Sequence, residues 1–390
     1  MTSLGQWIEP GLHQKILFII NSLTGGGAER VLATLLRHSE PWRDRFDIEL
    51  ALLDDEADAY AVPEWIRVHR LDCGFSLIRS ARRLRTLVAA RSPDITLSFL
   101  TRSNVANAYA MAGRARPWVI SERVNTSAHL GTGPRASFGR AMVRASYPRA
   151  DAIIAVSEGV SEDLRLNFGV SADRLVAIAN PIDAEAIRAL SGQPNRFADG
   201  APYVFAMGRL VENKNFAMLI DAFARSGLDG RLIIGGEGPL RAQLQGRIDA
   251  LGLRDRVELA GFLENPFAAV AGARFFVLPS NAEGFPNGLV EAMAIGKAVI
   301  STNCPSGPAE ILADRPRAAI DGLTIAPHGV LVPCNDADAL AQAMQRLADP
   351  ALCDDLADRA LHRALEYTPE RAAQRYWDVI EHALAPVRAR

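Results

Sequence analysis

The sequence lacks several features that mark particular classes of protein. No apolar run approaches the roughly 18 residues that a membrane-spanning helix needs. The first residues, MTSLGQWIEPGLHQ, lack the basic start and apolar core of a signal peptide. Neither a zinc site nor a disulfide framework is indicated, because the four cysteines are scattered without a C-x-x-C pair; they are Cys73, Cys304, Cys334 and Cys353. These absences predict a cytoplasmic protein.

Lysine is scarce as well, because only Lys15, Lys214 and Lys297 are lysines among 43 basic residues. Where arginine is the default, a lysine in a loop after a strand indicates a need for a compact ammonium group, and Lys214 occupies such a loop. The remaining composition, 49% apolar and 23% charged, is ordinary for a globular protein. A length of 390 residues is long for one core and predicts two α/β domains.

Charge is distributed unevenly, although the net charge is only −2. From Arg79 to Arg149, thirteen arginines stand against two acids, Asp94 and Glu122. Apolar residues such as Phe138 are interleaved with these arginines, which is typical of a surface that meets anionic membrane headgroups. An arginine-rich face that meets only water explains the pattern equally well. Nucleic acid is not an expected partner, because nothing resembles a recognition helix, a zinc finger or an aromatic stacking platform.

Two series of short apolar strands alternate with helical segments, which is typical of doubly wound, mostly parallel sheets. The strands predicted in the first half are 15–21, 46–53, 66–71, 94–99, 118–121, 151–156 and 174–179. Those predicted in the second half are 203–207, 231–235, 257–260, 274–278 and 297–301. Residues 191–202 contain glycine and proline but few apolar residues, which predicts a linker. We therefore expect a first domain over residues 1–190, a second over 191–370 and a final helix over 371–390.

The stretch from Pro279 to Lys297, PSNAEGFPNGLVEAMAIGK, has the features of a ligand site. It joins a buried strand to a helix, with Glu283 in the connecting loop and Glu291 in the first helical turn. The start of a helix has unpaired N–H groups and a partial positive charge, so it favours a phosphate. Close backbone approach and a fixed turn are provided by Gly284, Pro286 and Gly288. The stretch therefore predicts a site for an anionic, hydroxyl-rich ligand.

Other loops are expected at the same edge of the two sheets. Gly25–Gly27 lies between a strand and a helix, a shape that presents N–H groups to phosphates, although an ordinary tight turn is the alternative use of such glycines. Its spacing is not G-x-G-x-x-G, so a dinucleotide site is not supported. The loop GRLVENK places Arg209 and Lys214 after a strand of the second domain. Because ligands bind at the carboxyl ends of parallel strands, 101–104 and 122–125 are also expected to face the ligand.

Together these motifs resemble those of family 4 retaining glycosyltransferases of GT-B architecture. The matching features are E-x7-E from Glu283 to Glu291, Gly-Arg-x4-Lys from Gly208 to Lys214, and the sequence GGGAER, which is similar to the bacterial polysaccharide branch. The resemblance implies an α/β fold of two doubly wound Rossmann-like domains that face each other across a cleft. It also implies transfer of a hexose or N-acetylhexosamine from a UDP-sugar to a glycan acceptor carried by a polyprenyl diphosphate. It requires neither a metal nor another cofactor.

The resemblance assigns roles to the residues of these motifs. Arg209 and Lys214 would hold the donor diphosphate, and Glu291 would hold the ribose hydroxyls. Glu283 would bind the donor sugar and help to stabilise its positive ring. The other predicted donor-binding residues are Gly25, Gly26, Gly27, Gly284, Phe285, Pro286, Asn287, Gly288, Leu289 and Val290.

Predictions for the base and the acceptor depend on less specific features. Phe262 and Leu263 are candidates for the contact with uracil, and a simple turn is the alternative. Many relatives have a histidine near the reacting sugar, where this chain has Glu122 and Arg123. Glu122 is predicted to contact or deprotonate the acceptor hydroxyl, and an ion pair with Arg123 or another neighbour is the alternative. The predicted acceptor-binding residues are Arg102, Asn104, Arg123 and Asn125.

Alternatives to this assignment stay open. Asp336-Ala-Asp338 matches the D-x-D metal motif of the other large glycosyltransferase architecture, but it starts a predicted helical region, 337–366, where acids cap. We therefore predict a structural role for it. Nucleotide-sugar 2-epimerases share the GT-B architecture, although the two motifs with glutamate and lysine point away from them. A binding protein with a dead catalytic site would carry the same motifs.

Overall fold

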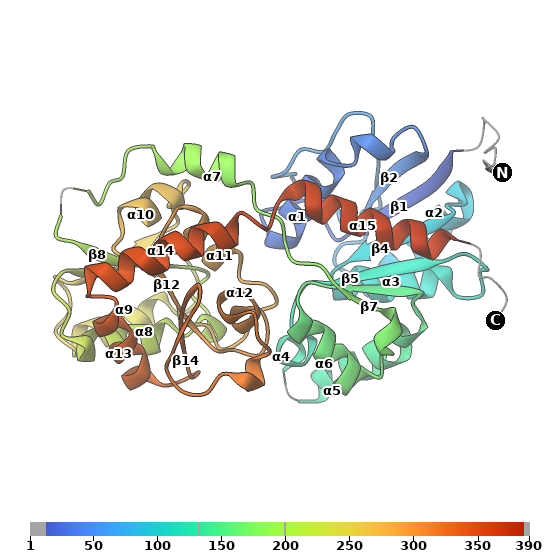
Figure 1. The fold of residues 1–390 in the computed structure, drawn as a ribbon. Helices are drawn as coiled ribbons and strands as arrows, with labels where there is room; N and C mark the ends of the chain where they lie inside the picture. The colour runs from blue at the N-terminus through green and yellow to red at the C-terminus, as the bar shows by residue number, and fades with distance from the viewer. Residues whose placement is uncertain (1–12, 132, 199, 386–390) are drawn as a thin grey trace, which may run out of the picture.

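The structure is a computed structural model that describes residues 13–131, 133–198 and 200–385. Figure 1 shows two α/β domains, one from each half of the chain, and a last helix, α15 (Pro369–Leu384), which lies on the first domain. Each domain is centred on a seven-stranded sheet. Within the described residues, no helix combines the length and the apolar character that crossing a membrane requires.

The first sheet is parallel throughout and has the strand order β3-β2-β1-β4-β5-β6-β7. Neighbouring strand residues point to opposite faces, so Phe18 packs with the core beneath α15 while Ile19 packs with the core on the other face. Because both faces are covered, the central strands are continuous apolar runs. The strands are β1 (Gln14–Ile20), β2 (Phe46–Leu52), β3 (Arg67–Arg70), β4 (Ile95–Phe99), β5 (Trp118–Glu122), β6 (Ala152–Ala155) and β7 (Leu175–Ala177).

Helices cover both faces of this sheet. Several begin at a polar residue that caps them: the side chains of Ser76, Asn125 and Ser157 accept bonds from main-chain N–H groups at the starts of α2, α4 and α6. The helical elements are α1 (Gly27–Arg37), η1 (Glu40–Trp42), α2 (Leu77–Arg91), α3 (Thr101–Met111), α4 (Thr126–Leu130), α5 (Pro134–Ser146), η2 (Tyr147–Arg149), α6 (Glu158–Phe168) and η3 (Ala172–Arg174).

The second sheet has the order β10-β9-β8-β11-β12-β14-β13 and is parallel except for β13, which is antiparallel to β14. Its strands are β8 (Tyr203–Met207), β9 (Arg231–Gly235), β10 (Val257–Gly261), β11 (Phe276–Leu278), β12 (Val299–Thr302), β13 (Thr324–Ala326) and β14 (Gly329–Val332). Its helical elements are η4 (Glu212–Lys214), α8 (Phe216–Ser226), α9 (Arg241–Ala250), α10 (Pro266–Gly272), α11 (Asn287–Ala294), α12 (Pro308–Ala313), η5 (Arg317–Ala319), α13 (Ala337–Arg346) and α14 (Pro350–Ala364). This pair of sheets confirms the predicted fold class.

The chain passes between the domains after β7 and again before α15. After the first crossing, α7 (Ala184–Ser191) packs against α10 and α11 of the second domain. After the second, α15 buries Trp377, whose ring stacks on Trp42 with centroids 5.1 Å apart and whose Nε1 donates to Ser39 Oγ at 2.9 Å. The boundary at residue 190 stays a prediction, and parts of the outer predicted segments, 1–12 and 386–390, lie outside the described residues.

Three differences from the expected elements have physical reasons. The β13–β14 hairpin and α7 were not predicted, because the two strands have only three and four residues and the helix only eight. The predicted helical region 337–366 is two helices, since Asp349 caps α14 by accepting from Ala351 N at 3.0 Å and Pro350 cannot continue α13. Asp336 caps α13 by accepting from Ala339 N at 2.8 Å, as predicted.

Candidate active site

The loops that follow β8 and β11 bring two predicted site residues together. Lys214 ends η4, and its Nζ lies 2.5 Å from Glu283 Oε1 in the loop before α11. Their side chains are 25% and 10% exposed. The two loops are tied by main-chain and amide bonds as well, because Asn213 Nδ2 donates to the carbonyl of Ala282 at 2.7 Å. Lys214 and Glu283, which lie 69 positions apart in the sequence, therefore form an ion pair in the structure.

Arg209 lies in the same loop, after β8. The backbones at this edge are in close contact, since a Cβ atom added at Gly236 would lie 2.0 Å from the carbonyl oxygen of Gly208. The Arg209 side chain is exposed and forms no ion pair with the described residues. A guanidinium without a carboxylate partner is available to bind an anion such as a phosphate.

Glu291, the second acid of E-x7-E, lies on α11 and is only 5% exposed. Its carboxylate forms an ion pair with Arg30 on α1 of the first domain. Arg30 was not among the predicted site residues, although it is the arginine of GGGAER. The two domains are therefore joined by a charged pair at the predicted ligand site.

The starts of α1 and α11 also meet at this place. A Cβ atom added at Gly27, the first residue of α1, would lie 3.0 Å from Asn287 Nδ2 at the start of α11. The carboxylate of Glu29 folds over the glycine loop, because a Cβ atom at Gly26 would lie 2.1 Å from its Oε2. Burial raises the pKa of Glu29, and a main-chain hydrogen bond opposes that rise. Two helix N-termini that face one place favour an anion there.

The loop from Gly284 to Val290 touches the first domain through its backbone. A Cβ atom added at Gly284 would lie 2.2 Å from the carbonyl oxygen of Arg123, so only glycine permits this approach. Phe285 is 8% exposed, and Leu289 is fully buried. Any ligand contact from Gly284 or Leu289 must therefore come through the main chain.

The two candidates for the base contact differ. Phe262, after β10, is 77% exposed. Leu263 packs toward β9, because a Cβ atom added at Gly235 would lie 3.1 Å from its Cδ1. Only the ring of Phe262 is free to meet a planar base.

The predicted acceptor-binding side chains lie at the carboxyl edge of the first sheet, where they form internal contacts. Arg102 forms an ion pair with Asp54. Asn104 is fully buried and donates to Tyr147 Oη at 3.1 Å. The side chain of Asn125 caps α4. The structure brings these residues together, but it does not leave their polar groups free.

Glu122 is fully buried at the end of β5. Its carboxylate accepts from the hydroxyl of Tyr147 and, at 3.0 Å, from the main-chain N of Arg123. Burial raises the pKa of Glu122, and these hydrogen bonds oppose the rise. The ion pair considered as an alternative does not form with Arg123, whose guanidinium donates instead to Tyr376 and Asn180.

Comparison with protein families agrees with this arrangement. Residues 25–186 match the model described as Glycosyltransferase Family 4, and residues 188–363 match the model described as Glycosyl transferases group 1. A relative from Campylobacter jejuni, N-acetylgalactosamine-N,N'-diacetylbacillosaminyl-diphospho-undecaprenol 4-alpha-N-acetylgalactosaminyltransferase, is 34% identical over 77% of this chain and 84% of its own. This chain belongs to glycosyltransferase family 4.

Further similar proteins extend the comparison of this family 4 glycosyltransferase to almost its whole length. A second Campylobacter jejuni protein, GalNAc-alpha-(1->4)-GalNAc-alpha-(1->3)-diNAcBac-PP-undecaprenol alpha-1,4-N-acetyl-D-galactosaminyltransferase, is 27% identical over 90% of this chain and 94% of its own. The solved structure of Anabaena Alr3699/HepE in complex with UDP and glucose has a TM-score of 0.71 at 22% identity and covers 95% of this chain and 100% of its own. Sucrose-phosphate synthase from Thermosynechococcus elongatus has a TM-score of 0.76 at 21% identity, with coverage of 95% and 99%. These structures show the shared GT-B fold.

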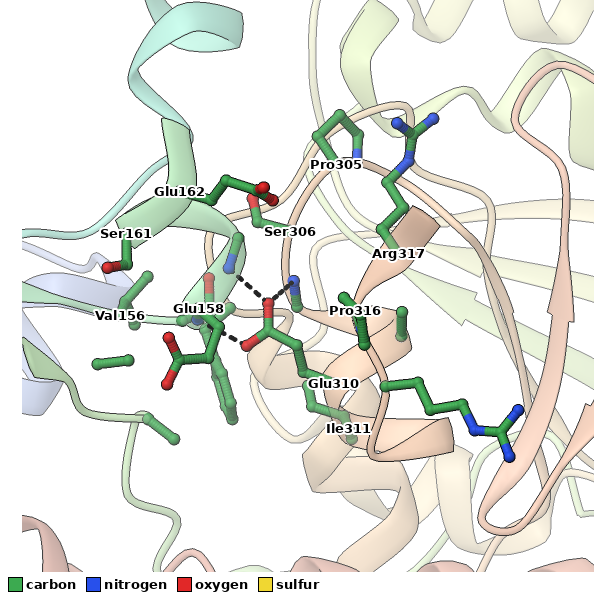
Figure 2. Close-up of a pocket in the computed structure, with 18 of the residues that line it drawn as sticks. Val156, Glu158, Ser161, Glu162, Pro305, Ser306, Glu310, Ile311, Pro316 and Arg317 are labelled. Carbon is green, nitrogen blue, oxygen red and sulfur yellow. Dashed lines mark hydrogen bonds between the residues drawn. The ribbon is translucent and has the colours of Figure 1, made fainter. Parts of the chain in front are cut away.

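The glycosyltransferase has a cavity of about 750 Å³ between α6 and α12, away from the ion pairs described above. Figure 2 shows that Glu310 of α12 reaches the start of α6, where its carboxylate accepts from Glu158 N and Gly159 N at 2.7 Å each. A Cβ atom added at Gly159 would lie 2.7 Å from Ser306 Cβ, so the domains also touch here. Phe285 lines this cavity. Lys214 and Glu291 are not among its described lining residues. This cavity lies beside the predicted donor site and is not the same place.

Proposed function

We propose that this glycosyltransferase moves a hexose or N-acetylhexosamine from a UDP-sugar, with retention and without a divalent cation, to a glycan on a polyprenyl diphosphate. The supporting observation is the pair of ion pairs at one place, Lys214 with Glu283 and Arg30 with Glu291, beside the unpaired Arg209. A bound diphosphate would take the cations as partners, and sugar and ribose hydroxyls would take the carboxylates. The ligand thus replaces each contact that it breaks.

The same residues account for the chemistry. Breaking the bond between the sugar and the diphosphate concentrates negative charge on the leaving group and leaves an oxocarbenium-like sugar. Arg209, Lys214 and the N–H groups at the starts of α1 and α11 would stabilise the leaving group. Glu283 would stabilise the positive sugar. The acceptor attacks the face that the phosphate leaves, and its proton passes to the leaving phosphate.

The acceptor side of the proposal depends on the first domain. Glu122 and its neighbours Arg102, Asn104 and Asn125 would shape the place where the acceptor hydroxyl approaches. The two Campylobacter jejuni relatives are named for substrates linked to diphospho-undecaprenol, which favours a lipid-linked acceptor. The complex of Alr3699/HepE with UDP and glucose favours a UDP-sugar as the donor.

A panel of nucleotide sugars would test the donor assignment by thermal shift, because a ligand that binds only the folded protein raises Tm. We expect a UDP-sugar to give the largest shift, and transfer to a polyprenyl-diphosphate glycan to persist in excess chelator. NMR of the product should show the anomeric configuration of the donor. Activity that is lost with chelator and restored by magnesium would contradict the metal-free mechanism, and an inverted product would contradict retention.

The two alternative functions give different outcomes. A 2-epimerase would convert the donor with no acceptor present, whereas the proposed enzyme would not. A non-catalytic binding protein would show the thermal shift but no transfer. If Glu283→Gln and Lys214→Ala both transferred sugar at the wild-type rate, the site itself would be wrongly assigned.

We also propose that the protein binds the cytoplasmic face of the membrane peripherally. Phe75 and Ile78 beside and on α2 are 69% and 66% exposed, and Phe138 on α5 is 67% exposed. Both helices pack against α3, so they belong to one layer of the first domain, and arginines such as Arg79 and Arg144 accompany them. Apolar side chains among arginines fit an anionic membrane surface.

Flotation with liposomes tests this surface. The protein should float with liposomes that contain anionic lipid at low salt, and less with neutral liposomes or at high salt. The double variant Ile78→Ser, Phe138→Ser should reduce flotation, whereas Leu365→Ser, at a residue 43% exposed on the second domain, should not. Equal flotation of both variants would contradict the proposal.

A further inference from the structure

Arg123 is a buried guanidinium at the junction of three segments. It follows β5 and is 7% exposed. Its Nη1 donates to Tyr376 Oη on α15 at 2.6 Å, and its Nη2 donates to Asn180 Oδ1 in the crossing after β7. Its Nε has no hydrogen-bond partner among the described residues. One side chain thus ties the end of β5 to α15 and to the crossing that follows β7.

The connection continues to the start of α11. Asn180 is 5% exposed, and its Nδ2 donates to Asn287 Oδ1 at 2.7 Å. Asn287 is the first residue of α11, beside Gly27 of the glycine loop. The backbone of Arg123 makes a second link, because Gly284 packs against its carbonyl oxygen. Arg123 therefore contacts the donor loop through its main chain and α11 through Asn180.

The charge of Arg123 is not compensated by a direct ion pair. The hydrogen-bond partners of its guanidinium are neutral groups, on Tyr376, Asn180 and Ser121, and no described carboxylate lies within salt-bridge distance. A buried cation of this kind costs free energy unless an anion is near. Its field reaches the glycine loop, where the charge of Arg123 acts against the rise that burial causes in the pKa of Glu29. That loop is where the proposed function places the donor diphosphate.

We propose that Arg123 is a positioning residue for the donor and does not bind the acceptor. It holds Asn287 and the start of α11 against the glycine loop, and its uncompensated charge makes this closed arrangement most stable when the diphosphate is bound. This inference depends on the proposed function, because it needs a donor that carries a diphosphate. This role replaces acceptor binding, which the position of Arg123 at a strand end predicted.

Two substitutions test the proposal. Arg123→Lys keeps the charge but cannot form the two-armed contact with Tyr376 and Asn180. Tyr376→Phe removes one hydroxyl and keeps the ring, which stacks on Phe99 with centroids 5.9 Å apart, so this variant should fold. Calorimetry should show the Kd for the UDP-sugar, without acceptor, rising about tenfold in Arg123→Lys and about threefold in Tyr376→Phe. The KM for the acceptor at saturating donor should stay within about twofold.

Arg174→Lys is the matched control for a purely structural effect. Arg174 is likewise held by uncharged oxygens, the carbonyls of Pro148 and Ala150 at 2.9 and 2.8 Å, but within the first domain. It should lower Tm to a similar degree and leave the donor Kd unchanged. The inference is overturned if the acceptor KM rises while the donor Kd stays constant, or if Arg174→Lys weakens donor binding as much as Arg123→Lys does. If the wild type binds no nucleotide sugar, the proposed function fails as well. If Arg123→Lys and Tyr376→Phe both bind the donor with the wild-type Kd, only this inference is overturned.

Discussion

The interface between the two domains has two regions of different chemistry. In the donor region, the ion pair of Arg30 with Glu291 joins the two domains, and that of Lys214 with Glu283 joins two loops of the second domain beside it. In the hinge region, between α6 and α12, the carboxylate of Glu310 caps main-chain N–H groups of the other domain. There, too, Phe285 packs edge-on against Tyr367, with ring centroids 5.4 Å apart.

The difference indicates which region a ligand can enter. A nucleotide sugar carries phosphates and hydroxyls, which can replace the charged partners of the donor region one for one. In the hinge region the carboxylate of Glu310 already accepts from the N–H groups at the start of α6, so a phosphate there would have to displace an anion. We therefore expect a ligand to rearrange the donor region, while the contact between α6 and α12, beside the cavity in Figure 2, persists.

The largest effect that would test this contrast is expected from Lys214→Ala. The variant loses a cation that stabilises the leaving diphosphate, so kcat/KM should fall by about 10²–10³-fold. Lys15→Ala is the matched control, because Lys15 lies on β1 outside this site, and it should stay within about twofold. Steady-state kinetics with donor varied provides the measurement. Equal activity of the two variants would place the chemistry elsewhere.

A smaller effect is expected from Arg30→Ala, on the other side of the donor region. Glu291 is nearly buried, and without Arg30 its carboxylate loses the charged partner that compensates its burial. The donor KM should rise about tenfold, with a lesser change in kcat. Arg37→Ala removes an arginine from the other end of α1, where it donates to Thr34 Oγ1 at 3.0 Å, and should leave the donor KM unchanged. A donor KM that responds equally to both changes would argue against a site at Glu291.

The two sides of the site were not equally predictable from the sequence. Glu283, Glu291, Arg209 and Lys214 belong to short motifs, and the sheet order places their loops side by side. The pairing of Arg30 with Glu291, 261 positions apart, depends on how two domains sit against each other, and no local pattern records that.

Strand-end position was a weaker guide in the first domain. It placed Asn104 and Glu122 at the expected edge of the sheet, and both side chains are fully buried there. Position at a strand end fixes where the backbone of a residue lies, but the rotamer and the neighbours of its side chain decide whether its polar group is free. Tyr147 accepts a hydrogen bond from Asn104 and donates one to Glu122. It comes from a helical turn distant in the sequence and belongs to no motif. The fold followed the same rule, since apolar runs located the central strands but not short elements such as α7.

The smallest effect is expected in the hinge region, from Glu310→Gln. The amide keeps one oxygen acceptor but loses the other, so the contact with Glu158 N and Gly159 N is weakened and not removed. The free energy of unfolding should fall by about 1 kcal/mol. Turnover should change much less than in Lys214→Ala, because Glu310 bonds to main-chain N–H groups of α6 and not to the residues proposed to bind the donor.

The pH dependence of stability separates this contact from the donor region. Burial raises the pKa of Glu310 above its ordinary value of 4.5, and its bonds from Gly159 N and Glu158 N oppose the rise. The folded protein therefore binds this proton more readily than the unfolded chain. The contribution is fully present below pH 4.5 and is lost as pH rises through the raised pKa. Urea unfolding across this range should show a shallower loss of stability in Glu310→Gln than in the wild type, and identical slopes would mean that the carboxylate ionises in the hinge as freely as it does in water.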